Sequence, residues 1–228
     1  MFWSKKRLQN ASLYLILDAQ ARLPDGQVLS YRDLLAQLKP VIRYGVDIVQ
    51  LRDKNGHAKD ILTFCRQARR IIADKALFIV NDRVDLAILA GADGVHLGQE
   101  DISYSQARKM MGAKAIIGIS CQTYVQAQKA QRAGADYIGF GSVFKTQTKP
   151  QRQVMNLKLL KRVIETIKIP VFPIGGINRD NLKQLTALGI KRAAVCRDIL
   201  LAKDVGESVR ELKLMLRTGE PPARPYKY

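Results

Sequence analysis

The chain has 228 residues, of which 47% are hydrophobic and 25% charged, so it can bury a sizeable core and is not a disordered chain. Its 38 Lys and Arg against 20 Asp and Glu give a formal net charge of +18, which favours partners that carry phosphate, including nucleic acid and anionic lipid. No apolar run is long enough to cross a bilayer, and residues 1–7 lack the apolar core of a secretory signal. Three widely spaced cysteines indicate neither a metal cluster nor a disulfide framework, so we expect reduced thiols in the cytoplasm.

The basic residues are scattered along the chain. They gather loosely at 5–7, 66–70, 158–168 and 217–227, without interleaved aromatic residues, which make up only 7% of the chain. A stacking platform for single-stranded nucleic acid is therefore disfavoured. We expect solvated basic faces and no specific nucleic-acid or membrane surface.

Short apolar runs alternate with longer stretches of helical periodicity, such as 31–43 and 61–73. Eight such units predict a closed parallel sheet, an α/β fold of the single (β/α)8 TIM-barrel type, over residues 13–217. An open, doubly wound sheet would need a glycine-rich fingerprint after the first run, and none follows it. We expect residues 1–12 to be a flexible basic segment and residues 218–228 a flexible, basic, proline-rich tail. The predicted strands are 13–17, 48–51, 77–80, 94–97, 115–119, 137–140, 171–174 and 193–196.

Glycine precedes several of the predicted strands at a fixed point. This residue accepts the left-handed backbone that ends a helix, so its recurrence marks helix-to-strand junctions and a repeat of βα units. The four glycines are Gly45, Gly91, Gly134 and Gly189.

A barrel of this kind carries its chemistry where the strands end. At the end of the second strand, alternation sends Gln50, Arg52 and Lys54 to one side, so two cations and an amide meet at the barrel mouth. A guanidinium and an ammonium together suit a polyanion such as pyrophosphate. The alternative is a surface ion pair with Asp53.

The third and fourth strand ends supply carboxylates. Asn81 and Asp82 follow the third strand, and Asp82 either caps the next helix or binds a metal ion. Asp101 lies in the neighbouring loop, so the two carboxylates are placed to share one Mg²⁺ through oxygen ligands. His96, between Val95 and Leu97, is better explained as a hydrogen-bonded histidine inside the barrel than as a base.

Hydroxyls and a cation follow the fifth and sixth strands. Ser120 offers a donor at the same rim or caps a helix, and the two uses are equally compatible with the sequence. Thr146, Thr148 and Lys149 follow a strand end rich in glycine, and this grouping favours a phosphate site over a plain polar loop.

The seventh and eighth strand ends extend the phosphate site of the sixth strand, so that one anion site lies on strands six to eight and a cationic, acid-flanked one on strands two to five. Gly175 and Gly176 let the backbone approach an anion, and we expect the N-terminus of the following helix to add a partial positive charge. Cys196 and Arg197 follow on the eighth strand, where barrels often bind phosphate. Two anion sites predict an enzyme with two substrates.

Taken in order, these segments resemble the thiamine-phosphate synthase family over residues 13 to about 200. The segment around His96 and the Thr-x-Thr-Lys segment are specific only in combination. The matching segments are 14–18 (YLILD), 50–54 (QLRDK), 81–85 (NDRVD), 91–101 (GADGVHLGQED), 117–120 (IGIS), 134–141 (GADYIGFG), 146–149 (TQTK) and 174–177 (IGGI).

The resemblance implies the barrel fold and a transferase that moves a pyrimidinylmethyl group with release of pyrophosphate. Small phosphorylated molecules are its implied partners, and homo-oligomer formation stays open. The implied ligands of the aminopyrimidine pyrophosphate are Gln50, Arg52, Lys54, Asn81, Ser120 and Lys149, with Arg52, Lys54 and Lys149 acting in catalysis. The implied ligands of Mg²⁺ are Asp82 and Asp101. The implied ligands of the hydroxyethylthiazole phosphate are Thr146, Thr148, Gly176, Cys196 and Arg197.

The implied reaction is dissociative, with pyrophosphate leaving before the thiazole nitrogen captures a pyrimidine-methyl cation. Such a reaction needs no protein nucleophile or base, and the sequence offers no conventional constellation of either. The protein would chiefly stabilise charge on the departing group and align the thiazole.

Three residues depart from the family pattern. Gln122 stands where the family usually has histidine, Arg197 stands where it commonly has serine, and Pro173 lies inside the seventh strand, where its missing N–H removes a ladder bond. The nearest rival is the related thiazole tautomerase, which works through a histidine base that Gln122 removes. A basic nucleic-acid-binding protein rests on net charge alone, and the intact acid pair argues against a decayed scaffold.

Overall fold

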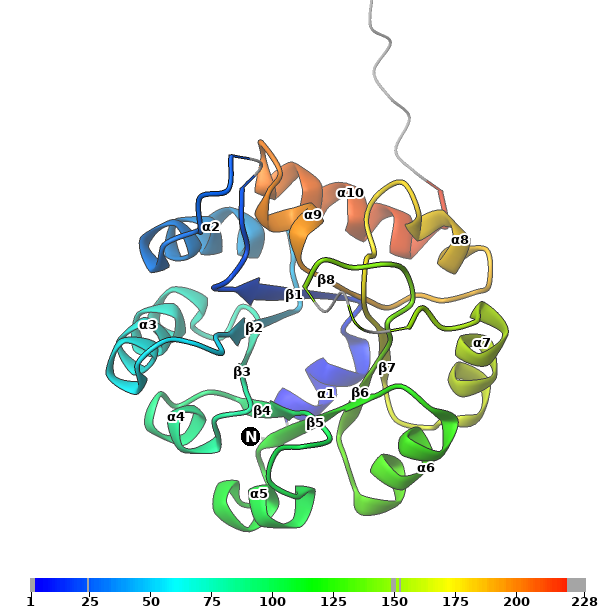
Figure 1. Ribbon diagram of the computed structural model, residues 1–228, viewed down its shortest axis with the longest axis horizontal. Helices are drawn as coiled ribbons and strands as arrows, with labels where there is room; N and C mark the ends of the chain where they lie inside the picture. Colours follow the sequence, from blue (N-terminus) through cyan, green and yellow to red (C-terminus); the bar gives the residue numbers. More distant parts are fainter. Residues whose placement is uncertain (1–2, 24, 149–150, 152, 221–228) are drawn as a thin grey trace, which may run out of the picture.

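The computed structural model describes residues 3–23, 25–148, 151 and 153–220. Eight parallel strands stand in a ring with helices around it, so the predicted TIM barrel is confirmed (Figure 1). The strands are hydrogen-bonded in the order β7-β6-β5-β4-β3-β2-β1-β8. Their bounds are β1 (Leu13–Asp18), β2 (Ile48–Arg52), β3 (Leu77–Asn81), β4 (Gly94–Leu97), β5 (Ile116–Cys121), β6 (Tyr137–Phe140), β7 (Val171–Pro173) and β8 (Ala193–Val195).

The helices form the outer layer of the barrel (Figure 1). The predicted 31–43 segment is α2 (Tyr31–Arg43), which begins at a capping box made by Ser30 and Asp33. The four predicted junction glycines all have positive φ, from 63° to 93°, as helix-ending residues do. The other helices are α1 (Trp3–Asn10), α3 (Ala58–Ile72), α4 (Val84–Leu89), α5 (Tyr104–Met111), α6 (Tyr124–Ala133), α7 (Leu157–Thr166), α8 (Leu182–Thr186), α9 (Arg197–Leu200) and α10 (Val205–Thr218).

The seam between β7 and β8 is the weakest part of the ring. The two strands share an isolated bridge, Ile174 to Ala194, in place of a ladder. The Ile174 N–H donates to the Phe140 carbonyl of β6. Because successive backbone N–H groups of a strand point to opposite neighbours, the backbone nitrogen of Pro173 points towards β8. Because proline has no N–H, it withholds a ladder bond from this seam, as the sequence indicated.

Two apolar cores lie on the two sides of the sheet. The larger fills the space between strands and helices, and the smaller fills the barrel interior around Tyr14, Tyr137 and Phe172. Strand glycines make room for the large interior side chains. A Cβ at Gly118 would overlap the Tyr137 ring, and one at Gly139 would lie 3.2 Å from the His96 ring.

Residues 3–10 form a helix, whereas the sequence predicted a flexible segment over 1–12. Leu8 is 1% exposed and joins Ala11 in the interior core, so α1 closes the end of the barrel opposite the strand ends (Figure 1). Arg7 also donates to the carbonyls of Asp74 and Lys75. The burial of one leucine in the open end of the barrel is the physical reason that the expectation was wrong here.

The last described helix ends close to the predicted start of the tail at residue 218. Helix α10 ends at Thr218, and Gly219 adopts a left-handed conformation that terminates it. Residues 221–228 of the predicted tail lie outside the described residues. Within the described part of the chain, no helix is both long and apolar enough to span a bilayer.

Candidate active site

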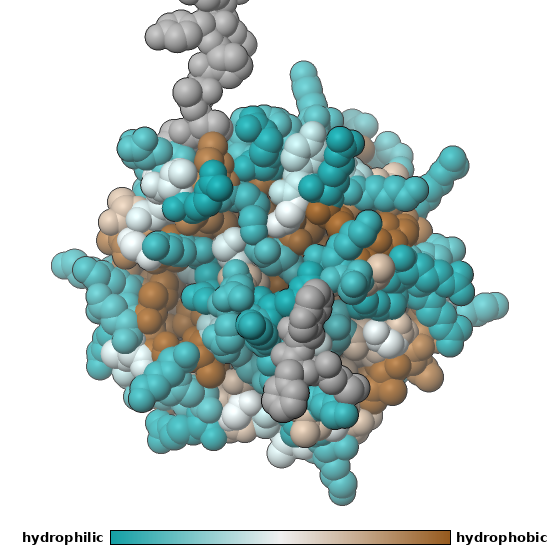
Figure 2. All heavy atoms as spheres, turned by 180° about the vertical axis from the view of Figure 1, so that it is seen from behind, coloured by the Kyte–Doolittle hydropathy of each residue, from teal (hydrophilic) through white to brown (hydrophobic). Residues whose placement is uncertain are grey.

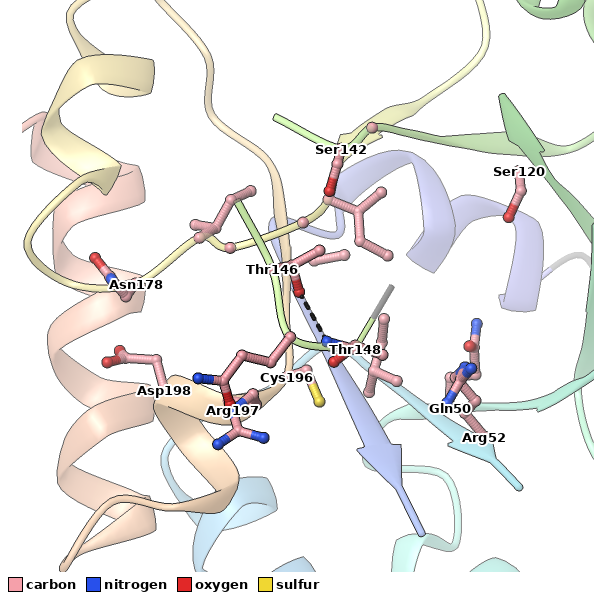
Figure 3. Close-up of a pocket in the computed structure, with 18 of the residues that line it drawn as sticks. Gln50, Arg52, Ser120, Ser142, Thr146, Thr148, Asn178, Cys196, Arg197 and Asp198 are labelled. Carbon is pink, nitrogen blue, oxygen red and sulfur yellow. Dashed lines mark hydrogen bonds between the residues drawn. The ribbon is translucent and has the colours of Figure 1, made fainter. Parts of the chain in front are cut away.

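One cavity of about 390 Å³ opens where the strands end. Figure 3 shows Gln50 and Arg52 on one side of it and Thr148, Cys196 and Arg197 on the other. Sequence-predicted residues that line it are Gln50, Arg52, Asn81, Ser120, Thr146, Thr148, Gly176, Cys196 and Arg197. Polar lining residues that the sequence did not single out are Ser142, Lys145, Gln147, Asn178 and Asp198. Lys149 lies outside the described residues.

Arg52 pairs with Asp18, not with Asp53. Its Nη1 donates to Asp18 Oδ1 at 2.8 Å, and the two side chains are only 14% and 5% exposed. The register of β1 and β2 sets these residues opposite each other. The Nε of Arg52 is buried without a hydrogen-bond partner in the described chain, although buried donors are normally satisfied.

Asp53 instead organises the loops around β1 and β2. It accepts hydrogen bonds from the Tyr31 hydroxyl and the Gln20 amide, and from the backbone N–H groups of Asn55 and Gly56. The surface ion pair that was the alternative reading of Arg52 is therefore wrong.

Lys54, Asp82 and Asp101 form a cluster beside the cavity and do not line it. Lys54 Nζ donates to Asp82, whose side chain also contacts Asp101. Asp82 has a φ of 61°, in the left-handed region, and Arg83 occupies the N-cap position of α4. Asp82 is thus not a helix cap. It adjoins Asn81, which does line the cavity, so the cluster lies at the cavity's edge.

The two carboxyl groups fit a divalent cation. Burial first, and then the neighbouring Asp101, raise the pKa of Asp82, while Lys54 opposes the rise. Two carboxyl groups in contact resist ionising together, and a bound cation would remove that resistance. No group of three or more His, Cys, Asp or Glu side chains gathers in the described residues, so substrate oxygens or water would have to complete a metal's shell.

A chain of hydrogen bonds crosses the floor of the cavity. Gln50 Nε2 donates to the Tyr14 hydroxyl at 2.6 Å, and that hydroxyl lies 2.8 Å from the hydroxyl of Tyr137. His96 Nδ1 is 3.0 Å from the Tyr137 hydroxyl, and its Nε2 is 2.9 Å from Ser120 Oγ. His96 is therefore a hydrogen-bonded barrel histidine, as the sequence favoured.

This series of hydrogen bonds holds the floor of the cavity in place from below. Gln50 and Ser120 line the cavity, whereas both tyrosines lie almost completely buried beneath it. Burial raises the pKa of each tyrosine, so both stay protonated. Thr123 caps α6, so Ser120 is not a cap and its hydroxyl faces the interior.

The glycine-rich side of the mouth is built by two loops in contact. The N–H of Phe144 donates to the Gly175 carbonyl at 2.9 Å, and the N–H of Val143 donates to the Ile174 carbonyl at 2.9 Å. Gly176 has a φ of 65°, and a Cβ there would overlap the Lys145 carbonyl oxygen. These glycines are thus needed for the loops to pack. Among the described residues, the N–H of Gly176 finds no acceptor, and Gly176 lines the cavity.

Helix α8 does not supply the predicted positive charge. It starts at Leu182, six residues after Gly176, and has only five residues. The intervening turn is held by Asn178 and Asn181, whose Nδ2 donates to the Gly176 carbonyl at 2.8 Å. The expectation of a helix N-terminus directly after these glycines was wrong, because an asparagine turn separates strand from helix.

The end of β8 contributes a thiol and a guanidinium. Burial raises the pKa of Cys196 to about 12, so this residue is a neutral thiol beside Thr148. Arg197 Nη2 makes a long contact of 3.4 Å with the Arg22 carbonyl, and the side chain lines the cavity. Asp198 is held by Arg179 at 3.2 Å. All three cysteines are free thiols.

Comparisons with known proteins match this geometry. Residues 13–199 match the family model described as thiamine monophosphate synthase. A thiamine-phosphate synthase of Fusobacterium nucleatum is 36% identical over 206 residues, covering 90% of this chain and 97% of the relative. The solved thiamine phosphate pyrophosphorylase from Pyrococcus furiosus superposes with a TM-score of 0.79 at 31% identity, covering 94% of this chain and 98% of that one.

Other relatives are longer than this chain. A thiamine-phosphate synthase of Gloeobacter violaceus is 40% identical over 205 residues, and the match covers 57% of that relative's length. The match to a thiamine-phosphate synthase of Prochlorococcus marinus covers 59% of that relative's length. The fold and the mouth define a parallel (β/α)8 barrel with a polar cavity at its strand ends. Within that class, the chain belongs to the thiamine monophosphate synthase family.

Proposed function

We propose that the chain is a thiamine-phosphate synthase. It would join 4-amino-2-methyl-5-hydroxymethylpyrimidine pyrophosphate to 4-methyl-5-(2-hydroxyethyl)thiazole phosphate and release pyrophosphate. The observation that carries the proposal is a single cavity with a buried, unsatisfied Arg52 Nε on one side and the glycine turn at Gly176 on the other. Similarity to the synthases named above supports it.

In this proposal, the β2 and β3 ends receive the pyrophosphate. The C–O bond breaks, its electron pair leaves with pyrophosphate, and the thiazole nitrogen donates a pair to the pyrimidine-methyl carbon. Arg52 would turn its free Nε–H to the departing oxygens, and Lys54 would exchange Asp82 for phosphate. Lys149 completes the proposed set of cations.

The pyrimidine ring would rest on the floor of the cavity. Gln50, Asn81 and Ser120 offer amide and hydroxyl groups there, and the hydrogen-bond chain below holds two of them in place. Fixed polar groups of this kind lower the barrier by orienting the reacting atoms.

Asp82 and Asp101 would hold Mg²⁺ in this proposal. When bound, the ion supplies positive charge to the oxygens of the leaving pyrophosphate. The contact between the two carboxyl groups, and the raised pKa that burial and Asp101 give to Asp82, support this assignment.

The opposite side would receive the thiazole phosphate. Thr146 and Thr148 supply hydroxyls, Gly176 supplies a free N–H and Arg197 supplies a cation. Cys196, as a neutral thiol, would contact the ligand without acting as a nucleophile.

A proton-transfer enzyme of the tautomerase type fits less well. Gln122 is exposed and does not line the cavity, and its position holds no base. The histidine that does line the cavity, His96, has both ring nitrogens engaged by Tyr137 and Ser120.

The decisive experiment is a product assay. Purified protein is mixed with Mg²⁺ and both substrates, and thiamine phosphate and pyrophosphate are measured together. We expect equal amounts of the two products, and neither when excess chelator is present. A folded protein that forms no thiamine phosphate would overturn the proposal.

A further inference from the structure

A second cavity, of about 700 Å³, lies at the end of the barrel opposite the mouth; we name it the basal cavity. It lies between the α1–β1 junction, the residues before β8 and the last turns of α10. Its volume is in the range of small-molecule sites. Figure 2 shows this face of the molecule, where hydrophilic side chains gather.

Five cations line the basal cavity, and no carboxylate lines it among the described residues. They are Lys191, Arg192, Arg210, Lys213 and Arg217. Two of them form ion pairs. Lys213 Nζ lies 2.7 Å from Asp47 Oδ2, and Arg210 pairs with Glu207. Within the described chain, Lys191, Arg192 and Arg217 form no ion pair.

Asp47 forms an ion pair with only one of the five cations, Lys213, within the described residues. Its Oδ2 already accepts from Ser12 N at 2.9 Å, Leu13 N at 2.9 Å and Lys213 Nζ at 2.7 Å. The positive charge of the basal cavity is therefore not balanced by the nearest acid.

Arg192 brings a half-buried guanidinium to this cavity. Its Nε donates to the Ala11 carbonyl at 3.1 Å and its Nη2 to the Gln9 carbonyl at 2.5 Å, which caps the end of α1. Desolvation lowers the pKa of Arg192, since carbonyl partners do not cancel its charge. An anion in the cavity would compensate it.

We propose that the basal cavity binds an oligophosphate anion, the chemistry shared by inorganic triphosphate and the phosphate chain of a nucleotide. Guanidinium and ammonium groups are the side chains that suit phosphate oxygens. Tyr44 and Leu214 add an apolar wall that a nucleoside would contact. The site is concave and has one aromatic residue, which favours a small anion over a nucleic-acid strand.

The test is a calorimetric titration with inorganic triphosphate, without divalent cation, on the whole chain. The double variant Lys191→Ala with Arg217→Ala removes two exposed cations that lack ion pairs and should weaken binding at the basal cavity more than about tenfold. The matched control is Arg66→Ala with Lys114→Ala, which removes the same charge from exposed positions outside the cavities described above. The control should bind as the unaltered protein does.

The mouth also contains cations, so the mouth variant Arg52→Ala is titrated in parallel. Binding that survives Arg52→Ala and is lost in the basal double variant supports the proposal. Equal binding by the basal variant and its matched control overturns it, as does binding of an RNA oligomer without binding of triphosphate. ATP binding tighter than triphosphate identifies a nucleotide, and equal binding identifies the phosphate chain alone. Because the basal variant leaves the mouth intact, its thiamine phosphate assay separates this test from that of the proposed function.

Discussion

The two sides of the barrel mouth hold their polar groups in different ways. On the side of β2 and β3, charged groups are already engaged, Arg52 with Asp18 and Lys54 with Asp82. On the side of β6, β7 and β8, the cavity is bordered by backbone and hydroxyl groups around Gly176, together with Arg197, which forms no ion pair within the described residues. Under the proposed function, the first side would have to exchange partners when a polyanion enters, whereas the second is shaped in advance by loop packing.

This difference predicts different sensitivities. A side that works by charge should lose activity when a charge is removed, even though the fold is unharmed. A side that works by backbone shape should lose affinity when a small side chain is added. Substitutions on each side, each paired with a control elsewhere in the barrel, test this contrast.

The largest effect is expected from Asp82→Asn. Asparagine keeps the shape and tolerates the φ of 61°, where alanine would add strain. Removal of the carboxylate should lower the rate of thiamine phosphate formation by about 100-fold or more. The melting temperature should not fall, because burial and Asp101 already disfavour the ionised form of Asp82.

Asp85→Asn is the matched control for that variant. Asp85 lies three residues further along, half exposed and paired with Arg83 at 2.6 Å. It should keep full activity. Normal activity in Asp82→Asn, or in excess chelator, would contradict the proposed metal site.

Arg52→Lys comes next in size. Lysine keeps the charge and can still reach Asp18, but it lacks the fork and the free Nε–H. We expect kcat/KM for the pyrimidine pyrophosphate to fall about 10–100-fold, corresponding to about 1.4–2.8 kcal/mol. Steady-state kinetics with each substrate varied in turn measures this.

The control for this exchange is Arg69→Lys, in the Arg69–Asp93 pair on the outer side of the sheet. Its kinetics should match those of the unaltered protein. Should Arg52→Lys change only the KM of the thiazole phosphate, the assignment of the two sides of the mouth would be reversed.

The sequence predicted the barrel because each of its eight units repeats one physical pattern. Apolar runs form the strands, and glycines such as Gly45 and Gly134 end the helices before them. It missed α1, because a short charged segment with one buried leucine has little periodicity. It also could not give strand register, which pairs Arg52 with Asp18 across β1 and β2.

Within the site, strand-end polarity was the reliable signal. Alternation along the second strand placed Gln50 at the mouth, and strand-end polarity drew attention to Asn81 and Ser120; all three line the cavity. The same reasoning also chose Lys54 and Asp82, which lie beside the cavity. Tyr14 and Tyr137 were missed, since an aromatic residue in a strand looks like ordinary core. The signal that could have found Tyr137 is the interior glycines of the neighbouring strands, which leave space that a large side chain must fill.

Gly176→Ala should affect the opposite side of the mouth. The added Cβ would meet the Lys145 carbonyl oxygen and displace the loop after β6. We expect the KM of the thiazole phosphate to rise about tenfold while that of the pyrimidine pyrophosphate stays unchanged, as measured by the same kinetics.

Gly189→Ala separates this effect from the cost of a positive φ. Gly189 has a φ of 77°, but a Cβ there would meet nothing within 4 Å. Both variants should lose stability, by about 1 kcal/mol for the backbone conformation, and only Gly176→Ala should change KM. Equal kinetics in the two variants would contradict a preformed phosphate side.

The smallest effect on activity is expected from Tyr137→Phe, which breaks the series of hydrogen bonds that runs beneath the cavity from Gln50 to Ser120. The Tyr14 hydroxyl and His96 Nδ1 would each lose a partner in a buried place, costing about 1–3 kcal/mol of unfolding free energy. The rate should fall only severalfold, because Ser120 and Gln50 keep their places on separate strands.

The control is Tyr104→Phe, which removes an exposed hydroxyl that donates to the Gly134 carbonyl at 2.6 Å. If Tyr137→Phe were to reduce the rate as strongly as Arg52→Lys without loss of stability, the floor of the cavity would take part in the reaction as directly as its charged side, and the contrast between the two sides would no longer explain the mouth.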